Sequence, residues 1–272
     1  MLTELPESDA TGEIAEIFAE IRHLYATPYV SSVHRHLATR PRVLEWSWGL
    51  VSPAFRSGVA QETGWGIAAN LALTPLSPIP REVLAVWGVA DSDVATLRTI
   101  AESFTRVAPL NLVYGGIVRD VARGARTEGR ASATTVPWTP PPASPKPPAM
   151  VDESRLSVAE RAVLQRFLSG TGNTAFVPGL YKMLAYWPGL LAHLAVELGP
   201  RFESAEKTEI AADLLRTIDA AVDGLRQNLP TPSQPPPSGD ESAHLVRMID
   251  GYRVTSPEMI LFGRLIRDAL PE

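Results

Sequence analysis

The side chains best suited to chemistry in this chain stand in two short segments. Ser31, Ser32 and His34 are close neighbours, and a histidine that is neutral near pH 7 can take up a proton while a serine hydroxyl holds its ring. Glu258 follows Pro257 at an expected helix start, where a carboxylate either acts as a general base or complements the helix dipole. His34 has a plain alternative too, as a surface or interface histidine. The sequence therefore offers two candidate bases.

The residues that the chain lacks, and the spacing of its histidines, exclude several kinds of functional site. The chain has no cysteine, which rules out disulfides, thiolate zinc sites, iron–sulfur clusters and thiol redox chemistry. His34 and His36 are two residues apart, so they do not share a helical face, and the other histidines are distant in sequence. No nucleophile elbow or phosphate-binding glycine motif is present. We expect no metal and no cofactor.

The charge and hydropathy of the chain limit the classes of partner that it can bind. The formal net charge is −5 and the sequence pI is about 5.6, whereas nucleic-acid binding requires a basic surface. No apolar run is long enough to cross a membrane, and the N-terminus is acidic where a signal peptide would be basic. We predict a cytoplasmic protein with neither nucleic-acid nor membrane partners, and leave open a homo-oligomer.

Periodicity predicts an almost wholly helical chain. Apolar residues between Glu13 and Leu24 recur every three or four positions, which is typical of an amphipathic helix. Ser157 and Glu160 form a capping box that predicts a helix through Leu168. Two proline-rich segments interrupt the pattern. We therefore predict a helical repeat over residues 1–127, a linker over 128–152, and a second repeat over 153–272 with a proline-rich loop at 230–239.

The two helical halves also match each other in sequence. At an offset of 147, ten identities fall in 36 ungapped positions, beginning with Thr27 and Thr174 and ending with Glu62 and Glu209. At an offset of 148, five residues recur and Phe104 is aligned with Tyr252. The five recurring residues are Leu97, Pro109, Gly115, Arg119 and Asp120. Each half is small, and packing against its copy would bury more apolar surface. The sequence predicts an all-α fold of two tandem homologous repeats, packed as an intramolecular pseudo-dimer.

Two features of the matched halves carry structural expectations. Pro41 and Pro188 are each expected at the first position of a helix, where a missing N–H costs nothing. The pairs Arg119-Asp120 and Arg267-Asp268 either lie on solvated helix faces or pair symmetrically between the repeats.

The residues that carry a family resemblance are the segment 12–44 (GEIAEIFAEIRHLYATPYVSSVHRHLATRPRVL), the segment 180–188 (LYKMLAYWP), and the proline-rich join between two helical halves. Together they resemble the non-stereoselective, D- and L-acting 2-haloacid dehalogenases of the all-helical group I. The resemblance implies a helical pseudo-dimer with a pocket between the repeats. There an aspartate activates the water that displaces the halide, and an asparagine helps to hold that water.

At the positions that match the family's catalytic pair, this chain carries apolar residues. The resemblance places the aspartate at Leu180, the serine before it at Gly179, and the asparagine at Ala108. A pocket tryptophan corresponds to Tyr29 and a phenylalanine to Ser32, while the pocket tyrosine is matched by Tyr252. A leucine cannot accept a proton, so we expect the family's hydrolysis to be lost unless another base replaces it.

Three functions remain open. The first is a divergent haloacid-dehalogenase-like protein that binds a small organic acid or apolar molecule between its repeats. The second is an active dehalogenase or related hydrolase that uses Glu258 or His34 as its base. The third is a non-enzymatic interaction protein. The pocket residues predicted for the first two are Tyr29, Ser31, Ser32, His34, Ala108, Gly179, Leu180, Tyr181 and Tyr252.

Overall fold

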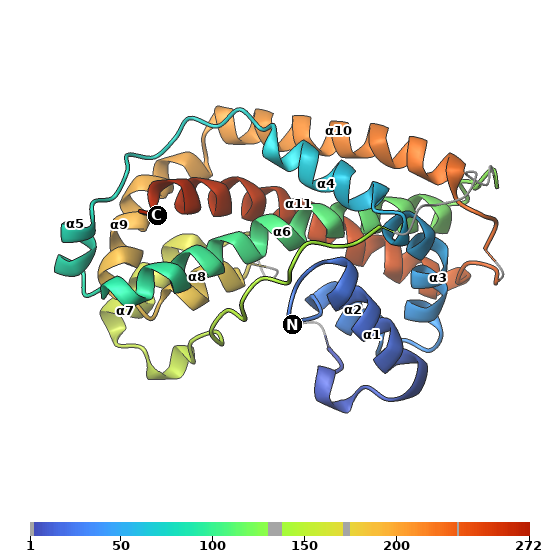
Figure 1. The fold of residues 1–272 in the computed structure, drawn as a ribbon, viewed down its shortest axis with the longest axis horizontal. Helices are drawn as coiled ribbons and strands as arrows, with labels where there is room; N and C mark the ends of the chain where they lie inside the picture. The colour runs from blue at the N-terminus through green and yellow to red at the C-terminus, as the bar shows by residue number, and fades with distance from the viewer. Residues whose placement is uncertain (1–2, 130–137, 171–174, 233) are drawn as a thin grey trace. The chain divides into compact units, whose positions relative to one another are not determined.

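A computed structural model describes residues 3–129, 138–170, 175–232 and 234–272 (Figure 1). Helices account for the regular structure of these residues, apart from one isolated bridge between Ser169 and Phe176. Among the described helices none is long and apolar enough to cross a membrane. The all-α prediction is confirmed. The α-helices are α1 (Gly12–Leu24), α2 (Ser32–Leu37), α3 (Val43–Arg56), α4 (Val59–Ala69), α5 (Arg81–Val86), α6 (Asp91–Ala122), α7 (Val158–Leu164), α8 (Gly179–Leu184), α9 (Pro188–Phe202), α10 (Ala205–Asn228) and α11 (Gly239–Ala269).

Local sequence signals place several helix ends correctly. Both hydrogen bonds of the Ser157–Glu160 capping box are present at the start of α7, which confirms the predicted start. The predicted end at Leu168 is wrong, because α7 ends at Leu164 and only a 3-10 turn continues to Phe167. Pro188 is the first residue of α9, as predicted. The same prediction for Pro41 is wrong, because Arg42 takes a left-handed conformation (φ 64°) and turns the chain before α3 begins. A proline can therefore stand just outside a helix as well as at its first position.

The chain divides into two compact units, each with segments from both halves of the sequence. Unit 1 comprises residues 1–70, 106–145 and 215–256, and unit 2 comprises residues 71–105, 146–214 and 257–272. The boundaries between them fall inside α6, α10 and α11. These units reflect how the segments pack, whereas the predicted repeats are defined by sequence similarity. The predicted repeat boundaries therefore stay a prediction.

Helix bounds recur with the spacing found in the sequence. Helices α2 and α8 are 147 residues apart at both ends. Helices α6 and α11 begin 148 residues apart, and each has a proline in its interior, Pro109 and Pro257, at that same spacing. These correspondences support the predicted duplication, although the pseudo-dimer itself remains a prediction.

The close contacts between α6 and α11 in unit 1 are made at positions aligned with those of unit 2, with the two helices exchanged. In unit 1, a Cβ on Gly115 of α6 would lie 3.0 Å from Ile249 of α11. In unit 2, a Cβ on Gly263 of α11 would lie 3.0 Å from Thr105 and 3.2 Å from the carbonyl oxygen of Ala101, both on α6. Gly263 corresponds to Gly115, and Ala101 to Ile249, at the offset of 148. The two glycines therefore have the same role in each unit, which is to let α6 and α11 approach closely.

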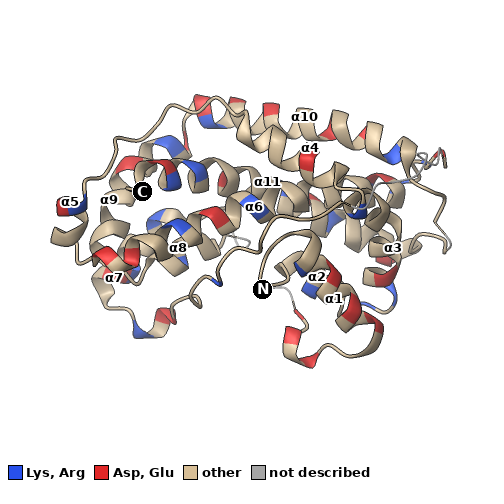
Figure 2. Cartoon of the chain, in the orientation of Figure 1, with Lys and Arg blue, Asp and Glu red and all other residues tan. Residues whose placement is uncertain are grey.

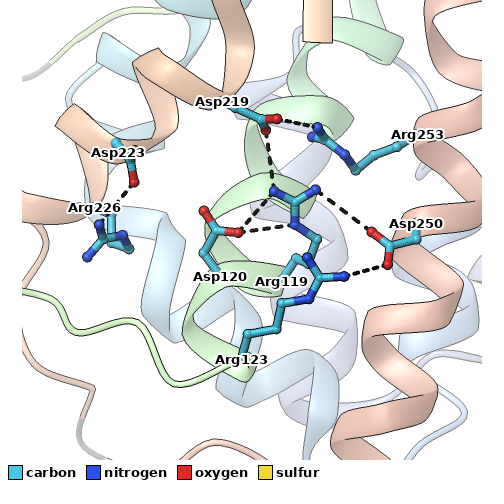
Figure 3. Close-up of polar contacts among 8 residues, drawn as sticks. All are labelled: Arg119, Asp120, Arg123, Asp219, Asp223, Arg226, Asp250 and Arg253. Atoms are coloured by element: carbon cyan, nitrogen blue, oxygen red, sulfur yellow. Dashed lines mark hydrogen bonds and ion pairs between the residues drawn. The ribbon is translucent and has the colours of Figure 1, made fainter. Parts of the chain in front are cut away.

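An ion-pair network in unit 1 joins α6, α10 and α11 (Figure 3). Arg119 of α6 pairs with Asp120 at 3.0 Å, with Asp219 of α10 at 3.4 Å and with Asp250 of α11 at 3.8 Å, and its side chain is only 12% exposed. Asp219 also binds Arg253 at 2.7 Å. Arg119 therefore joins the sequence halves instead of lying on a solvated helix face. Its partners in the second half are Asp219 and Asp250 and not Asp268, so the predicted symmetric pairing is wrong.

The corresponding Arg267 in unit 2 pairs with the adjacent Asp268. Elsewhere, acidic and basic residues are interspersed along the helices instead of gathering by sign (Figure 2). The Arg119 network is thus a specific contact between helices, whereas the pair of Arg267 with Asp268 stays within α11.

Replacing Gly115 by valine should destabilise the protein by about 1–3 kcal/mol, because the added methyl groups meet Ile249 across the α6–α11 contact. The measurement is the urea midpoint at unchanged slope. Gly251, also inside a long helix, would have nothing within 4 Å of an added Cβ, so Gly251→Val is the matched control and should change stability by less than about 0.5 kcal/mol. Equal losses in both variants would contradict the close approach.

Candidate functional site

The predicted site residues fall into two groups, one in each unit. Unit 1 holds Tyr29, Ser31, Ser32, His34, Ala108 and Tyr252. Unit 2 holds Gly179, Leu180, Tyr181 and Glu258. Each group is described in its own unit below.

In unit 1 the structure brings Ser31 and His34 into contact. Ser31 precedes α2, and its Oγ lies 2.8 Å from Nδ1 of His34, one turn later. The same hydroxyl donates to Oδ1 of Asn111 on α6 at 3.2 Å. When the Ser31 hydroxyl donates to Asn111, its oxygen accepts from His34, so the ring proton of His34 is on Nδ1. The predicted hydrogen bond between a serine and His34 is confirmed.

Aromatic rings enclose the imidazole of His34. The ring centroids of Tyr114, Tyr25 and Trp48 lie 4.5 Å, 5.5 Å and 6.3 Å from that of His34. Burial lowers the pKa of His34 to about 3. Its Nε2 is buried and has no hydrogen-bond partner among the described residues. His34 is therefore a neutral core residue, and a group with so low a pKa is a poor proton acceptor near neutral pH.

Asn111 is a polar site residue that the sequence reasoning missed. It stands three residues after Ala108 on α6, so the two lie on one helical face. The buried Ala108 occupies the expected asparagine position, while the amide that contacts Ser31 is one turn further along. Helical periodicity applied around Ala108 could have found it.

A second polar cluster in unit 1 surrounds Ser32. Its hydroxyl donates to Oε1 of Glu4, and the hydroxyl of Tyr252 donates to Ser32 Oγ at 2.9 Å. Arg35 donates from Nη2 to Oε2 of Glu4 at 2.6 Å. Because Ser32 and Tyr252 belong to different sequence halves, this cluster joins the halves within one unit. Glu4 was missed because it lies 28 residues before Ser32 and nothing in the local pattern connects them.

In unit 2 the position expected for the aspartate is apolar and enclosed. Leu180 lies in α8 and is 0% exposed. A Cβ on the preceding Gly179 would lie 3.4 Å from Phe104 Cζ and 3.4 Å from Met150 Sδ. Tyr181 stacks on Phe167, with ring centroids 4.2 Å apart. Nothing at the start of α8 in these contacts supplies a proton acceptor.

Glu258 is buried in unit 2, and its predicted place at a helix start is wrong. Helix α11 continues through Pro257, so Glu258 stands in the interior of the helix, where it cannot complement the positive end of the dipole. Ser169 donates to its Oε2 at 2.8 Å, and the residue is 7% exposed. Burial raises the pKa of Glu258, while the Ser169 hydrogen bond and the charge of Lys207 oppose the rise. Of the two candidate bases, Glu258 has the environment of a group tuned for proton transfer.

Two histidines that the sequence left apart meet in unit 1. The Nε2 atoms of His36 and His244 are 3.1 Å apart, and Nδ1–H of His36 donates to the carbonyl oxygen of Thr3 at 2.7 Å. If Nδ1 carries the only ring proton of His36, its Nε2 accepts from Nε2–H of His244. Within the described ranges no third ligand joins them in a metal-binding group.

A depression of about 200 Å³ lies on unit 2, and it involves none of the predicted pocket residues. Its lining is almost wholly apolar and comes from Ala159, Glu160, Val163, Ala185, Pro188 and Leu191. The predicted pocket therefore stays a prediction.

The ring of His34 should not titrate between about pH 5 and pH 8, whereas in the urea-denatured chain it should titrate near its usual value. Below about pH 6.5 the unfolded chain binds a proton that the folded chain refuses until about pH 3. Stability should therefore fall as the pH drops through this window, by up to about 1.4 kcal/mol per pH unit. The check is the pH dependence of the ring ¹⁵N shifts. A shift in the folded state with a midpoint above pH 5 would refute the burial argument.

Among the comparisons with known proteins, the one with solved structures identifies the fold. No protein-family model matches the chain, and no curated protein matches it. The solved structure of a D-2-haloacid dehalogenase mutant with D-2-CPA is 17% identical over 99% of this chain and 96% of that one, with a TM-score of 0.73. The complex of D-2-haloacid dehalogenase with L-LA is 17% identical over 99% and 97%, with a TM-score of 0.74. The chain thus has the all-helical fold of the D-2-haloacid dehalogenases, which confirms at the level of the fold the resemblance seen in its sequence.

Proposed function

We propose that the chain is a divergent haloacid-dehalogenase-like protein that binds a small organic acid or apolar molecule and has lost the hydrolytic dehalogenation of that fold. The observation that carries this proposal is the burial of Leu180, which is 0% exposed where the resemblance places the water-activating aspartate. A hydrocarbon side chain there neither takes a proton from water nor leaves room for a carboxylate.

The side chains around the other proposed site positions fit binding better than hydrolysis. The ring of His34 is neutral and has a pKa of about 3, so it gives little driving force for proton abstraction. The cluster of Ser32, Arg35 and Tyr252 instead offers hydroxyl donors and one guanidinium. Such donors orient an anion by charge-assisted hydrogen bonds. In this proposal the acid binds where the two sequence halves meet in unit 1.

A second candidate function rests on Glu258. A buried carboxylate with a raised pKa is a stronger base near neutral pH than an exposed one, and Ser169 would hold its orientation. In this alternative Glu258 takes a proton from a water molecule as the water oxygen attacks the halogen-bearing carbon and halide leaves. The chain would then be a hydrolase acting on 2-haloacids through a base outside the family position.

Halide release from 2-chloropropionate separates the two candidates. We expect none from the unaltered chain, and slow release from the Leu180→Asp, Ala108→Asn double variant, because it restores a base and an amide at the positions that the resemblance assigns. The matched control is Leu180→Asn with Ala108→Asn, which has the polarity but no proton acceptor. Circular dichroism shows whether each variant folds. Release by a folded control would mean that the base is not at residue 180.

Glu258→Gln tests the alternative base. If Glu258 is catalytic, the unaltered chain releases halide and the variant loses about 100-fold or more. If it is structural, the variant gains stability relative to the unaltered chain as the pH rises above 4.5, because the folded carboxyl has a raised pKa and its ionisation destabilises the unaltered chain. The two measurements are the rate of halide release and the melting temperature at several pH values.

A further inference from the structure

We propose that Ser32, Arg35 and Tyr252 form a binding site for a small monocarboxylate, and that the carboxylate of Glu4 occupies this site as an internal competitor. The inference rests on the function proposed above, because it names the group of the ligand that the chain recognises. It adds a regulatory element, the N-terminal segment of residues 3–7, here called the strap.

Each oxygen of the Glu4 carboxylate has its own donor. Ser32 donates to Oε1, and Arg35 donates from Nη2 to Oε2 at 2.6 Å. A hydroxyl on one oxygen and a guanidinium on the other would hold the carboxylate of a free acid in the same way. Glu4 therefore stands in for the ligand.

Tyr252 fixes the direction of the Ser32 hydrogen bond. Burial raises the pKa of Tyr252, so its phenol keeps its proton near neutral pH. That proton is donated to Ser32 Oγ at 2.9 Å, which leaves the hydroxyl hydrogen of Ser32 directed at the carboxylate. The site is thus built to donate, and it suits an anion.

Glu4 does not use all of the donors of Arg35. The Nε of Arg35 is buried and has no hydrogen-bond partner among the described residues. A guanidinium binds a carboxylate best through two parallel N–H groups. Glu4 is constrained by its own backbone and reaches only Nη2, whereas a free acid could also approach Nε. A free ligand therefore has a contact to gain.

The strap is held by polar contacts and not by buried apolar side chains. Leu5 N–H donates to the carbonyl oxygen of Arg35 at 3.0 Å, His36 donates to Thr3, and Glu7 accepts from Val30 N–H at 2.8 Å. None of the five strap residues is buried. The Arg35 and Glu4 side chains are 29% and 28% exposed, so their ion pair is weakened by solvent. Opening the strap breaks these polar contacts and the ion pair of Glu7 with Arg22 at 2.6 Å, but it exposes no fully buried apolar side chain of the strap.

The test is the binding of propionate to the full chain, measured by calorimetry. Removing the charge in Glu4→Gln should tighten binding about tenfold, because the site no longer spends most of its time occupied by its own carboxylate. Adding Arg35→Gln to that variant should abolish the gain. Glu13→Gln is the matched control, since it removes one negative charge from an exposed pair with Arg42 and should bind like the unaltered chain. In the unaltered chain, saturating propionate should speed amide exchange at Leu5.

Three results would overturn the inference. Equal affinity of the unaltered chain and Glu4→Gln, insensitive to Arg35→Gln, would place the acid elsewhere and leave the proposed function standing. An equal gain in Glu13→Gln would reduce the effect to net charge. If neither the unaltered chain nor Glu4→Gln binds propionate or 2-chloropropionate, the monocarboxylate site and the organic-acid part of the proposed function fail together.

Discussion

The close approach of α6 and α11 is the constraint on which the packing of both units depends. Glycine stands where each helix meets the other, at Gly115 in unit 1 and at Gly263 in unit 2, and a Cβ at either position would press on its neighbour. The same helices supply Tyr252, which reaches Ser32, and Phe104, which reaches Gly179. At the repeat offsets these two contacts are also counterparts. A shift of α11 would therefore change the contact of Tyr252 with Ser32, and a shift of α6 would change the contact of Phe104 with Gly179.

Dense packing decides what each ionisable group in the interior can do. An imidazole with no charged partner is kept neutral, as the pKa of His34 shows, while a carboxyl with a single hydroxyl donor is pushed towards its protonated form, as the raised pKa of Glu258 shows. Glu4, by contrast, lies at the edge of unit 1 against a guanidinium. Burial thus makes His34 a neutral packing residue, and it leaves Glu258 as the buried carboxyl whose pKa is raised.

Sequence periodicity predicted the helical class and several helix ends because these depend on neighbours within one turn. The capping box at Ser157 and the first residue of α9 are examples. It failed where a rule admits two outcomes: Pro257 lies inside α11 instead of marking its start, so Glu258 was assigned to the wrong environment. The candidate site was predicted less completely. Its partners lie far apart in the chain, as with Glu4 and Ser32 or His36 and His244, and no local pattern encodes such pairs.

Matched positions of the two sequence halves differ in their hydrogen-bonding groups. At the offset of 147, the polar Ser32 is aligned with Gly179, and the imidazole of His34 is aligned with the phenol of Tyr181. At the offset of 148, Phe104 is aligned with Tyr252. Each exchange removes or alters a hydrogen-bonding group while the ring or backbone that fills the space is retained. Apolar packing is needed in both units, whereas a buried polar group is stable only where it has a hydrogen-bond partner, because without one it costs desolvation. In unit 1 the hydroxyls of Tyr252 and Ser32 form a chain of hydrogen bonds that ends on the carboxylate of Glu4, whereas in unit 2 the matched Gly179 lies against the apolar side chains of Phe104 and Met150.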